Sequence, residues 1–166
     1  VKMHLLTFVA DGQERLGLEV AGYVVDLAAG FAIVEAQAPS GLPTPPTDMR
    51  SFLEAGDQAM KAANRVSDFF TDSLAHGRKV GFSGRPRTLF TRAEVQVLAP
   101  ISNPHKILLL GLNYSEHAAE TGAKLPSAPV IFAKFDNAII GPGQPIVLPQ
   151  VAPDHVDLEA ELAFVV

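Results

Sequence analysis

The 166-residue chain contains no cysteine. This absence excludes disulfide bonds, thiolate metal ligands and a cysteine nucleophile, and it is typical of a protein that works in the cytoplasm. No apolar run approaches the roughly 18 residues that a membrane span requires. The first residues, VKMHLLTFVADG, lack the long apolar core of a signal peptide and instead predict a strand. We therefore expect a cytoplasmic globular protein without a membrane partner.

Basic side chains are scarce in the last part of the chain. The formal net charge is −5, which argues against a nucleic-acid partner bound through its phosphates. Neither Lys nor Arg follows Lys134, whereas five carboxylates do: Asp136, Asp154, Asp157, Glu159 and Glu161. Carboxylates crowded without basic partners need water or a cation to offset their repulsion. This segment is therefore a candidate for cation binding.

The first 95 residues predict a small domain of strands followed by helices. Strand patterns cover residues 4–10, 16–20 and 23–27, and Asp11-Gly12 and Ala21-Gly22 are turn signals between them. The Pro-rich stretch 39–48 predicts a loop whose last residues, Thr47 and Asp48, can cap a short helix. Apolar residues spaced three to four apart from Ala59 to Leu74 predict a longer helix that packs against the core.

Residues 96–166 predict a second domain, which is richer in strands than the first. Strand-like segments cover 95–99, 106–110, 129–134 and 146–148, followed by a long strand over 156–166. A short helix is predicted over 114–121, closed by Gly122. The predicted organisation is therefore an α+β chain with domains at 1–95 and 96–166.

The sequence HVDLEAELAFVV carries the first candidate site. In a strand, side chains alternate between faces, so Glu159 and Glu161 would lie on one face, about 7 Å apart along the backbone. Hard divalent cations such as Mg²⁺ prefer oxygen ligands of this kind. An exposed amphipathic strand is the equally simple alternative. The lack of nearby basic residues favours the metal site slightly.

The sequence LLLGLNYSEHAAE carries the second candidate site. On the predicted helix, Tyr114 and His117 lie three residues apart, as do His117 and Glu120, so the three share a face. A carboxylate one turn from a His can orient it and raise its basicity, which suits a general base. A surface His beside a helix-end Glu is the more common explanation of such a pattern.

Lys134 is a third candidate, at the end of the apolar segment VIFAK. Strand ends often face a site, and an ammonium there could supply positive charge to an anionic substrate. An exposed lysine at a strand end is the more frequent case.

Taken in order, the motifs G-x-N-Y-x-x-H, a strand Lys, I-G-P-G and E-x-E resemble the fumarylacetoacetate hydrolase family. The resemblance is strong over about residues 95–166 and weak over the N-terminal part. It implies a small N-terminal β/α domain followed by the start of a mixed, mostly β catalytic domain. A departure at Leu112, where the liver fumarylacetoacetase has an acidic ligand, indicates the acylpyruvase and 2-oxo acid hydrolase-isomerase branch, and it argues against fumarylacetoacetate as the substrate.

The resemblance implies a role for each candidate. Glu159 and Glu161 correspond to carboxylates that bind Mg²⁺ or Mn²⁺, and the family's third acidic ligand lies downstream of them. His117 with Glu120 corresponds to a water-activating pair, Lys134 to a site lysine, and Tyr114 to a residue at the edge of the substrate site.

The implied activity is hydrolysis of a C–C bond in a 2,4-dioxo acid such as an acylpyruvate, through a metal-stabilised enolate. Isomerisation, hydration or decarboxylation of 2-oxo dicarboxylates in aromatic catabolism is the alternative. A non-catalytic module that retains the fold is the alternative of another class. A homodimer is expected for the complete protein.

The chain ends inside the apolar run LAFVV, whereas natural C-termini are usually polar and exposed. Family members also continue well past E-x-E. We therefore expect a fragment that binds metal weakly and is inactive alone, because two carboxylates give a cation fewer ligands than it needs.

Overall fold

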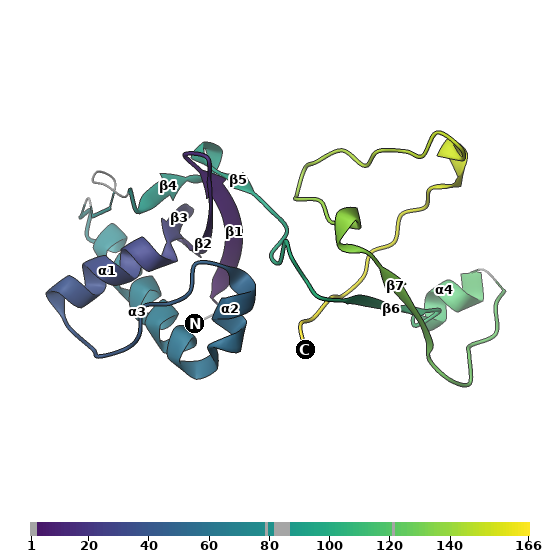
Figure 1. Ribbon diagram of the computed structural model, residues 1–166, viewed down its shortest axis with the longest axis horizontal. Coiled ribbons are helices and arrows are strands. Elements are labelled where there is room, and N and C mark those ends of the chain that lie inside the picture. The colour runs from purple at the N-terminus through teal and green to yellow at the C-terminus, as the bar shows by residue number, and fades with distance from the viewer. Residues whose placement is uncertain (1–2, 79, 82–86, 121) are drawn as a thin grey trace.

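The computed structural model describes residues 3–78, 80–81, 87–120 and 122–166. The fold class is α+β, as the sequence predicted, and two parts follow one another along the chain (Figure 1). The first holds a five-stranded sheet with three helices. The second holds a two-stranded sheet, one short helix and long connecting segments. None of the described helices is both long and apolar enough to cross a membrane.

The first sheet is antiparallel, and its first three strands form a meander. Its strands are β1 (His4–Ala10), β2 (Gln13–Val20), β3 (Tyr23–Asp26), β4 (Leu89–Thr91) and β5 (Gln96–Val97), in the spatial order β4-β3-β2-β1-β5. The turn between β1 and β2 places Asp11 and Gly12 at positive φ, which fits the Asp-Gly signal in the sequence. The sheet continues two residues past the predicted boundary at 95, because β5 pairs with β1.

Three helices lie between β3 and β4 in the chain: α1 (Leu27–Gln37), α2 (Met49–Glu54) and α3 (Gly56–Ala75). The predictions of α2 and α3 are confirmed, whereas α1 was not predicted from the sequence. Its sequence, LAAGFAIVEAQ, is apolar nearly all round and therefore lacks the periodic polar face that reveals a helix. A Cβ on Gly30 would lie 2.8 Å from Val66 Cγ1, so this glycine allows α1 to approach α3 closely.

Two apolar clusters cover opposite faces of the first sheet. Val25 belongs to the larger cluster under α1 and α3, and its neighbour Val24 belongs to the smaller one with Phe8 and Phe90. This division follows from the pleat, which sends successive side chains to opposite faces. Helices cover the larger cluster only.

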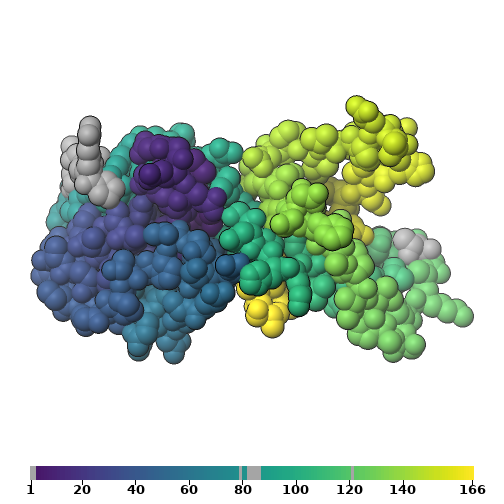
Figure 2. All heavy atoms as spheres, in the orientation of Figure 1, coloured from purple at the N-terminus to yellow at the C-terminus, as the bar shows by residue number. Residues whose placement is uncertain are grey.

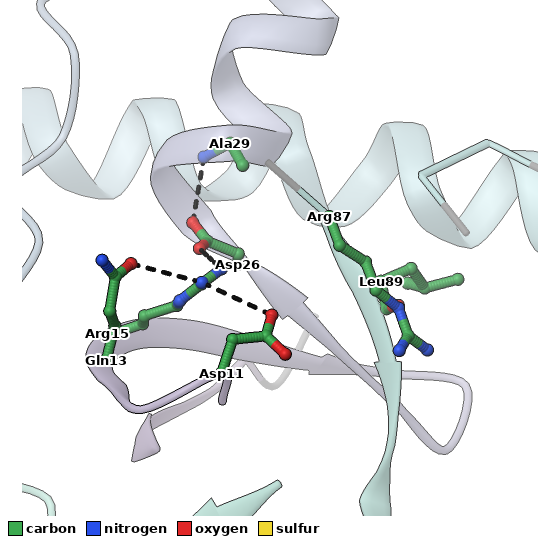
Figure 3. A network of polar contacts seen from close by, with 7 residues as sticks. All are labelled: Asp11, Gln13, Arg15, Asp26, Ala29, Arg87 and Leu89. Carbon is green, nitrogen blue, oxygen red and sulfur yellow. Dashed lines mark hydrogen bonds and ion pairs between the residues drawn. The ribbon is translucent and has the colours of Figure 1, made fainter. Parts of the chain in front are cut away.

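A buried polar network joins the meander to α1 (Figure 3). Asp26 caps α1, because its Oδ1 accepts a hydrogen bond from the backbone N–H of Ala29 at 3.0 Å. Its Oδ2 accepts a hydrogen bond from Arg15 Nη1 at 3.1 Å, and the two side chains are only 11% and 13% exposed. The Arg15 guanidinium also lies 5.6 Å from the centre of the Phe90 ring. One carboxylate therefore fixes a strand and the start of a helix together.

The second part begins with β6 (Ile107–Gly111), which pairs with β7 (Val130–Lys134) in an antiparallel register. Between them lies α4 (Ser115–Glu120), close to the predicted helix, of which Thr121 lies outside the described residues. Short 3-10 turns at Asp136–Ala138 and Pro153–His155 interrupt the chain after β7.

Two strand predictions are wrong. Residues 146–148 and 156–166 form no strand, and the backbone there runs without a ladder. Alternating side chains favour a strand only when a neighbouring strand supplies hydrogen bonds. Neither β6 nor β7 pairs with these segments, so their pattern is not enough.

The second part exposes much of its apolar surface. Large side chains such as Leu108, Ile131 and Phe135 are 64%, 63% and 80% exposed, whereas the buried core lies almost entirely before residue 100. In Figure 2 the atoms of the first part form one continuous body, and those of the second form separate lobes in this view. A two-stranded sheet without a covering layer is marginally stable.

We expect Asp26→Ala to lower the free energy of unfolding by about 2–3 kcal/mol, because it removes a helix cap and leaves the buried Arg15 without its carboxylate. Asp48→Ala is the matched control. Asp48 caps α2 through Ser51 N–H at 2.9 Å, and its loss should cost about 1 kcal/mol. Urea denaturation followed by circular dichroism measures both. Equal losses in the two variants would contradict a special role of the Arg15–Asp26 pair.

Glu94 gives a pH-dependent contribution to stability. Hydrogen bonds from Arg87 and then from the Thr91 backbone lower the pKa of Glu94 from 4.5 to about 2. Because the folded-state pKa lies below the unfolded one, the stabilisation is complete above pH 4.5 and is lost as the pH falls toward 2. We expect Glu94→Gln to remove this part of the pH dependence of unfolding. If the difference in free energy of unfolding between Glu94→Gln and the wild type stays constant from pH 6 down to the pH of acid unfolding, the contribution of Glu94 is refuted.

Candidate functional site

The connection from β6 to α4 carries most of the predicted site residues. The chain leaves β6 at Gly111 and passes through Leu112 with a φ of 53°, a left-handed conformation that is uncommon for a branched residue. Asn113 and Tyr114 follow, and α4 starts at the next residue. The turn at Leu112 therefore determines where the side chains of Asn113 and Tyr114 lie.

His117 and Glu120 lie on one face of α4, as their spacing predicted. Nδ1 of His117 is 4.0 Å from Oε2 of Glu120, and the two side chains are 48% and 79% exposed. The groups attract each other when the imidazole is protonated, although water weakens the attraction at this exposure. The pair can thus accept a proton from a molecule that approaches the exposed face of α4.

The C-terminal segment meets the start of α4 at two points. Asn113 Nδ2 donates a hydrogen bond to Oε2 of Glu161 at 3.4 Å, and the Leu162 backbone N–H donates to the Tyr114 hydroxyl, also at 3.4 Å. Tyr114 and Glu161, 47 residues apart in sequence, therefore lie in one neighbourhood. Glu159 is exposed on the same segment.

Lys134 lies away from this neighbourhood. It is the last residue of β7 and pairs with Ile107, the first residue of β6, whereas Gly111 at the other end of β6 pairs with Val130. Four strand residues separate the two ends, which is about 13 Å along the strand. The structure thus brings Tyr114, His117, Glu120 and Glu161 into one region and leaves Lys134 at the opposite end of the hairpin.

The donor chemistry of Glu159 and Glu161 suits a hard divalent cation, since both offer carboxylate oxygens and neither Lys nor Arg follows Lys134. Among the described ranges, however, no group of three or more His, Cys, Asp or Glu side chains is gathered as a metal would require. Glu159 and Glu161 could therefore supply at most part of a ligand set, and the described residues do not complete it.

An open hollow of about 360 Å³ lies at the Gly111–Val130 end of the hairpin. It is lined by the end of β6, by Asn113 and by the segment from Leu125 to Val130. This volume is within the usual range of small-molecule sites. The hollow is open to solvent and lies beside the connection from β6 to α4.

Two features of this region were not singled out from the sequence. Asn113 stands inside the G-x-N-Y motif, and that motif was the signal that could have drawn attention to it. The left-handed turn at Leu112 leaves no sequence signal, because glycine or asparagine is the usual residue for such a φ.

The chain is similar to several known proteins. Residues 106–166 match the family model described as fumarylacetoacetate (FAA) hydrolase C-terminal. The chain is 36% identical to the mitochondrial oxaloacetate tautomerase fahd2 of Xenopus laevis over 170 residues, which cover 100% of this chain and 44% of that protein. It is 34% identical to the mitochondrial oxaloacetate tautomerase Fahd2a of Rattus norvegicus, with 99% of this chain and 45% of that protein covered.

A solved structure shares the fold. It is a Mycobacterium smegmatis protein with the name HpcE, at a TM-score of 0.53 and 25% identity over 87% of this chain and 40% of that one. The chain thus spans less than half the length of these relatives.

Paired cysteines can test the strand register that separates Lys134 from the start of α4. The native chain has no cysteine, so each double variant holds only two thiols. Leu109 and Phe132 are partners in the register, so Leu109→Cys with Phe132→Cys should form a disulfide under mild oxidation. Gly111→Cys with Lys134→Cys should not, because these positions lie at opposite ends of the hairpin. Mass spectrometry of the oxidised monomers distinguishes them, and rapid bridging of the second pair would contradict the register.

Proposed function

Because the chain belongs to the fumarylacetoacetate hydrolase family, we propose that the full-length protein is a metal-dependent enzyme that acts on small 2-oxo acids. The observation that carries the proposal is the pairing of His117 with Glu120 beside Tyr114, whose hydroxyl contacts the segment with Glu159 and Glu161. A proton acceptor and carboxylate ligands in one region are what enolisation of a 2-oxo acid needs.

The first candidate reaction is keto–enol isomerisation of a 2-oxo dicarboxylate. The relatives named oxaloacetate tautomerase match nearly the whole chain, which favours this reaction. His117 would accept the proton that leaves carbon 3 of the acid, and a proton would be returned to the keto oxygen, so no atom is gained or lost. Glu120 would stabilise the protonated imidazole.

The second candidate is hydrolysis of a C–C bond in a 2,4-dioxo acid, for which a His–Glu pair is equally suited. His117 would take a proton from a water molecule whose oxygen attacks the distal carbonyl. The C–C bond then breaks, and its electron pair and a proton go to the pyruvate-type fragment. This reaction needs an ordered water beside the substrate, whereas isomerisation needs none.

Mg²⁺ or Mn²⁺ is the proposed cofactor, with Glu159 and Glu161 as two of its ligands. When bound, it would supply positive charge to the carboxylate and keto oxygens of the acid. Tyr114 would contact the substrate at the edge of the site. Lys134 is proposed as a source of positive charge on the family resemblance alone, because the hairpin register places it at the other end of β6 from Tyr114.

A substrate panel on the full-length protein tests the proposal. We expect Mg²⁺-dependent turnover of oxaloacetate, an acylpyruvate or an unsaturated 2-oxo dioic acid. Loss of the enol absorbance without release of pyruvate indicates isomerisation, release of pyruvate with a carboxylic acid indicates hydrolysis, and release of pyruvate with CO₂ indicates decarboxylation. Glu161→Gln and Glu159→Gln should lower turnover by at least about 100-fold, because a lost metal ligand costs more than the ~10–100-fold typical of groups that only support ligands. His117→Ala should also abolish turnover.

Asp157→Asn is the matched control, because Asp157 lies on the same acidic segment and its Oδ1 accepts a hydrogen bond from the neighbouring Leu158 N–H. It should keep near-normal turnover. Binding of the acids without turnover of any of them would instead support a non-catalytic module. Equal activity of Glu161→Gln and Asp157→Asn would exclude the proposed ligands.

A further inference from the structure

Glu161 receives a neutral hydrogen-bond donor. Asn113 Nδ2 lies 3.4 Å from Oε2 of Glu161, and no Lys or Arg occurs in the sequence after Lys134. An amide donor holds one carboxylate oxygen in place without neutralising the charge, whereas an ammonium or guanidinium would compete with a cation for it. Within the part of the chain that the structure describes, no other side chain donates a hydrogen bond to the Glu161 carboxylate, so Oε1 could still face a metal.

The backbone directs Asn113 to this position at a cost. Leu112 adopts a φ of 53°, and a left-handed conformation costs a residue with a Cβ roughly 1–2 kcal/mol. Strained non-glycine residues of this kind gather at functional sites. The turn brings Asn113 and Tyr114 against two successive residues of the C-terminal segment, Glu161 and Leu162. The contacts therefore fix both the position of the segment and the orientation of the Glu161 carboxylate.

We propose that Asn113 is a positioning residue that orients the carboxylate of Glu161 for a divalent cation. The inference rests on the proposed function, in which Glu161 is a metal ligand. Groups that hydrogen-bond a metal ligand orient it and raise the affinity of the site, and their loss typically costs about 10–100-fold. Because the hydrogen bond of Asn113 is long and exposed, we expect an effect at or below the lower end of that range.

The test measures Mn²⁺ affinity of the full-length protein by electron paramagnetic resonance of the free ion, without substrate. Asn113→Ala should weaken Mn²⁺ binding by about threefold to tenfold. Asn113→Gln keeps an amide donor on a longer side chain and should recover part of the loss. Asn103→Ala is the matched control, because Asn103 is an exposed asparagine in the segment between β5 and β6, and it should bind as the wild type does.

Each outcome supports or overturns the inference. A Mn²⁺ affinity of Asn113→Ala within twofold of the wild type would overturn the inference. A loss of affinity that Asn113→Gln does not partly recover, or that Asn103→Ala also shows, would overturn it as well. The thermal unfolding midpoint should be equal in all variants, and a parallel fall in Asn113→Ala would mean a structural role instead. Glu161→Gln separates the two proposals. If Glu161→Gln retains full Mn²⁺ affinity, the proposed metal site is wrong. If Glu161→Gln loses Mn²⁺ affinity while Asn113→Ala keeps it, the metal site stands and only the positioning role of Asn113 is wrong.

Discussion

The antiparallel pairing of β6 with β7 determines where Lys134 lies relative to Tyr114, His117 and Glu120. Its register places Gly111 opposite Val130 at one end and Ile107 opposite Lys134 at the other. The start of α4 is attached to the first end, so Tyr114, His117 and Glu120 gather there, next to the hollow lined by Asn113. A slip of one residue would reverse the face of each side chain on the strand, so the ladder fixes orientation as well as position.

The two parts of the chain differ in how their apolar surface is used. The first sheet has α1 and α3 over one face, and the Arg15–Asp26 pair ties that helical layer to the strands. The hairpin of β6 and β7 has no such layer, and all five residues of β7 are exposed. Side chains on an uncovered hairpin are held by the backbone hydrogen bonds between the strands and by local contacts. The second part of the chain, which carries the candidate site, therefore depends on few interactions.

The charge distribution of the C-terminal segment is compatible with the proposed cation site. The segment after β7 has neither Lys nor Arg, and its described contacts to the start of α4 involve an amide and a phenol. Neutral partners bring no cation that would compete for the carboxylate oxygens, which is what the proposed metal site requires. The His117–Glu120 pair lies on the helix that follows these contacts, which places a proton acceptor close to the proposed ligands.

The sequence alone determined the local features of this protein. Turn residues such as Asp11-Gly12, the cap at Asp48, the apolar period of α3 and the spacing of His117 and Glu120 act over a few residues, so their outcome can be read from the chain. The order of motifs from Tyr114 to Glu161 likewise indicated the family. The tertiary structure alone decided what depends on distant partners. Residues 156–166 alternate like a strand but find no neighbouring strand, Lys134 is carried away from His117 by the hairpin register, and Asn113 reaches Glu161 through a left-handed turn at a leucine. Helix α1 forms because its apolar surface is buried against the sheet and α3, which no period in its own residues could show.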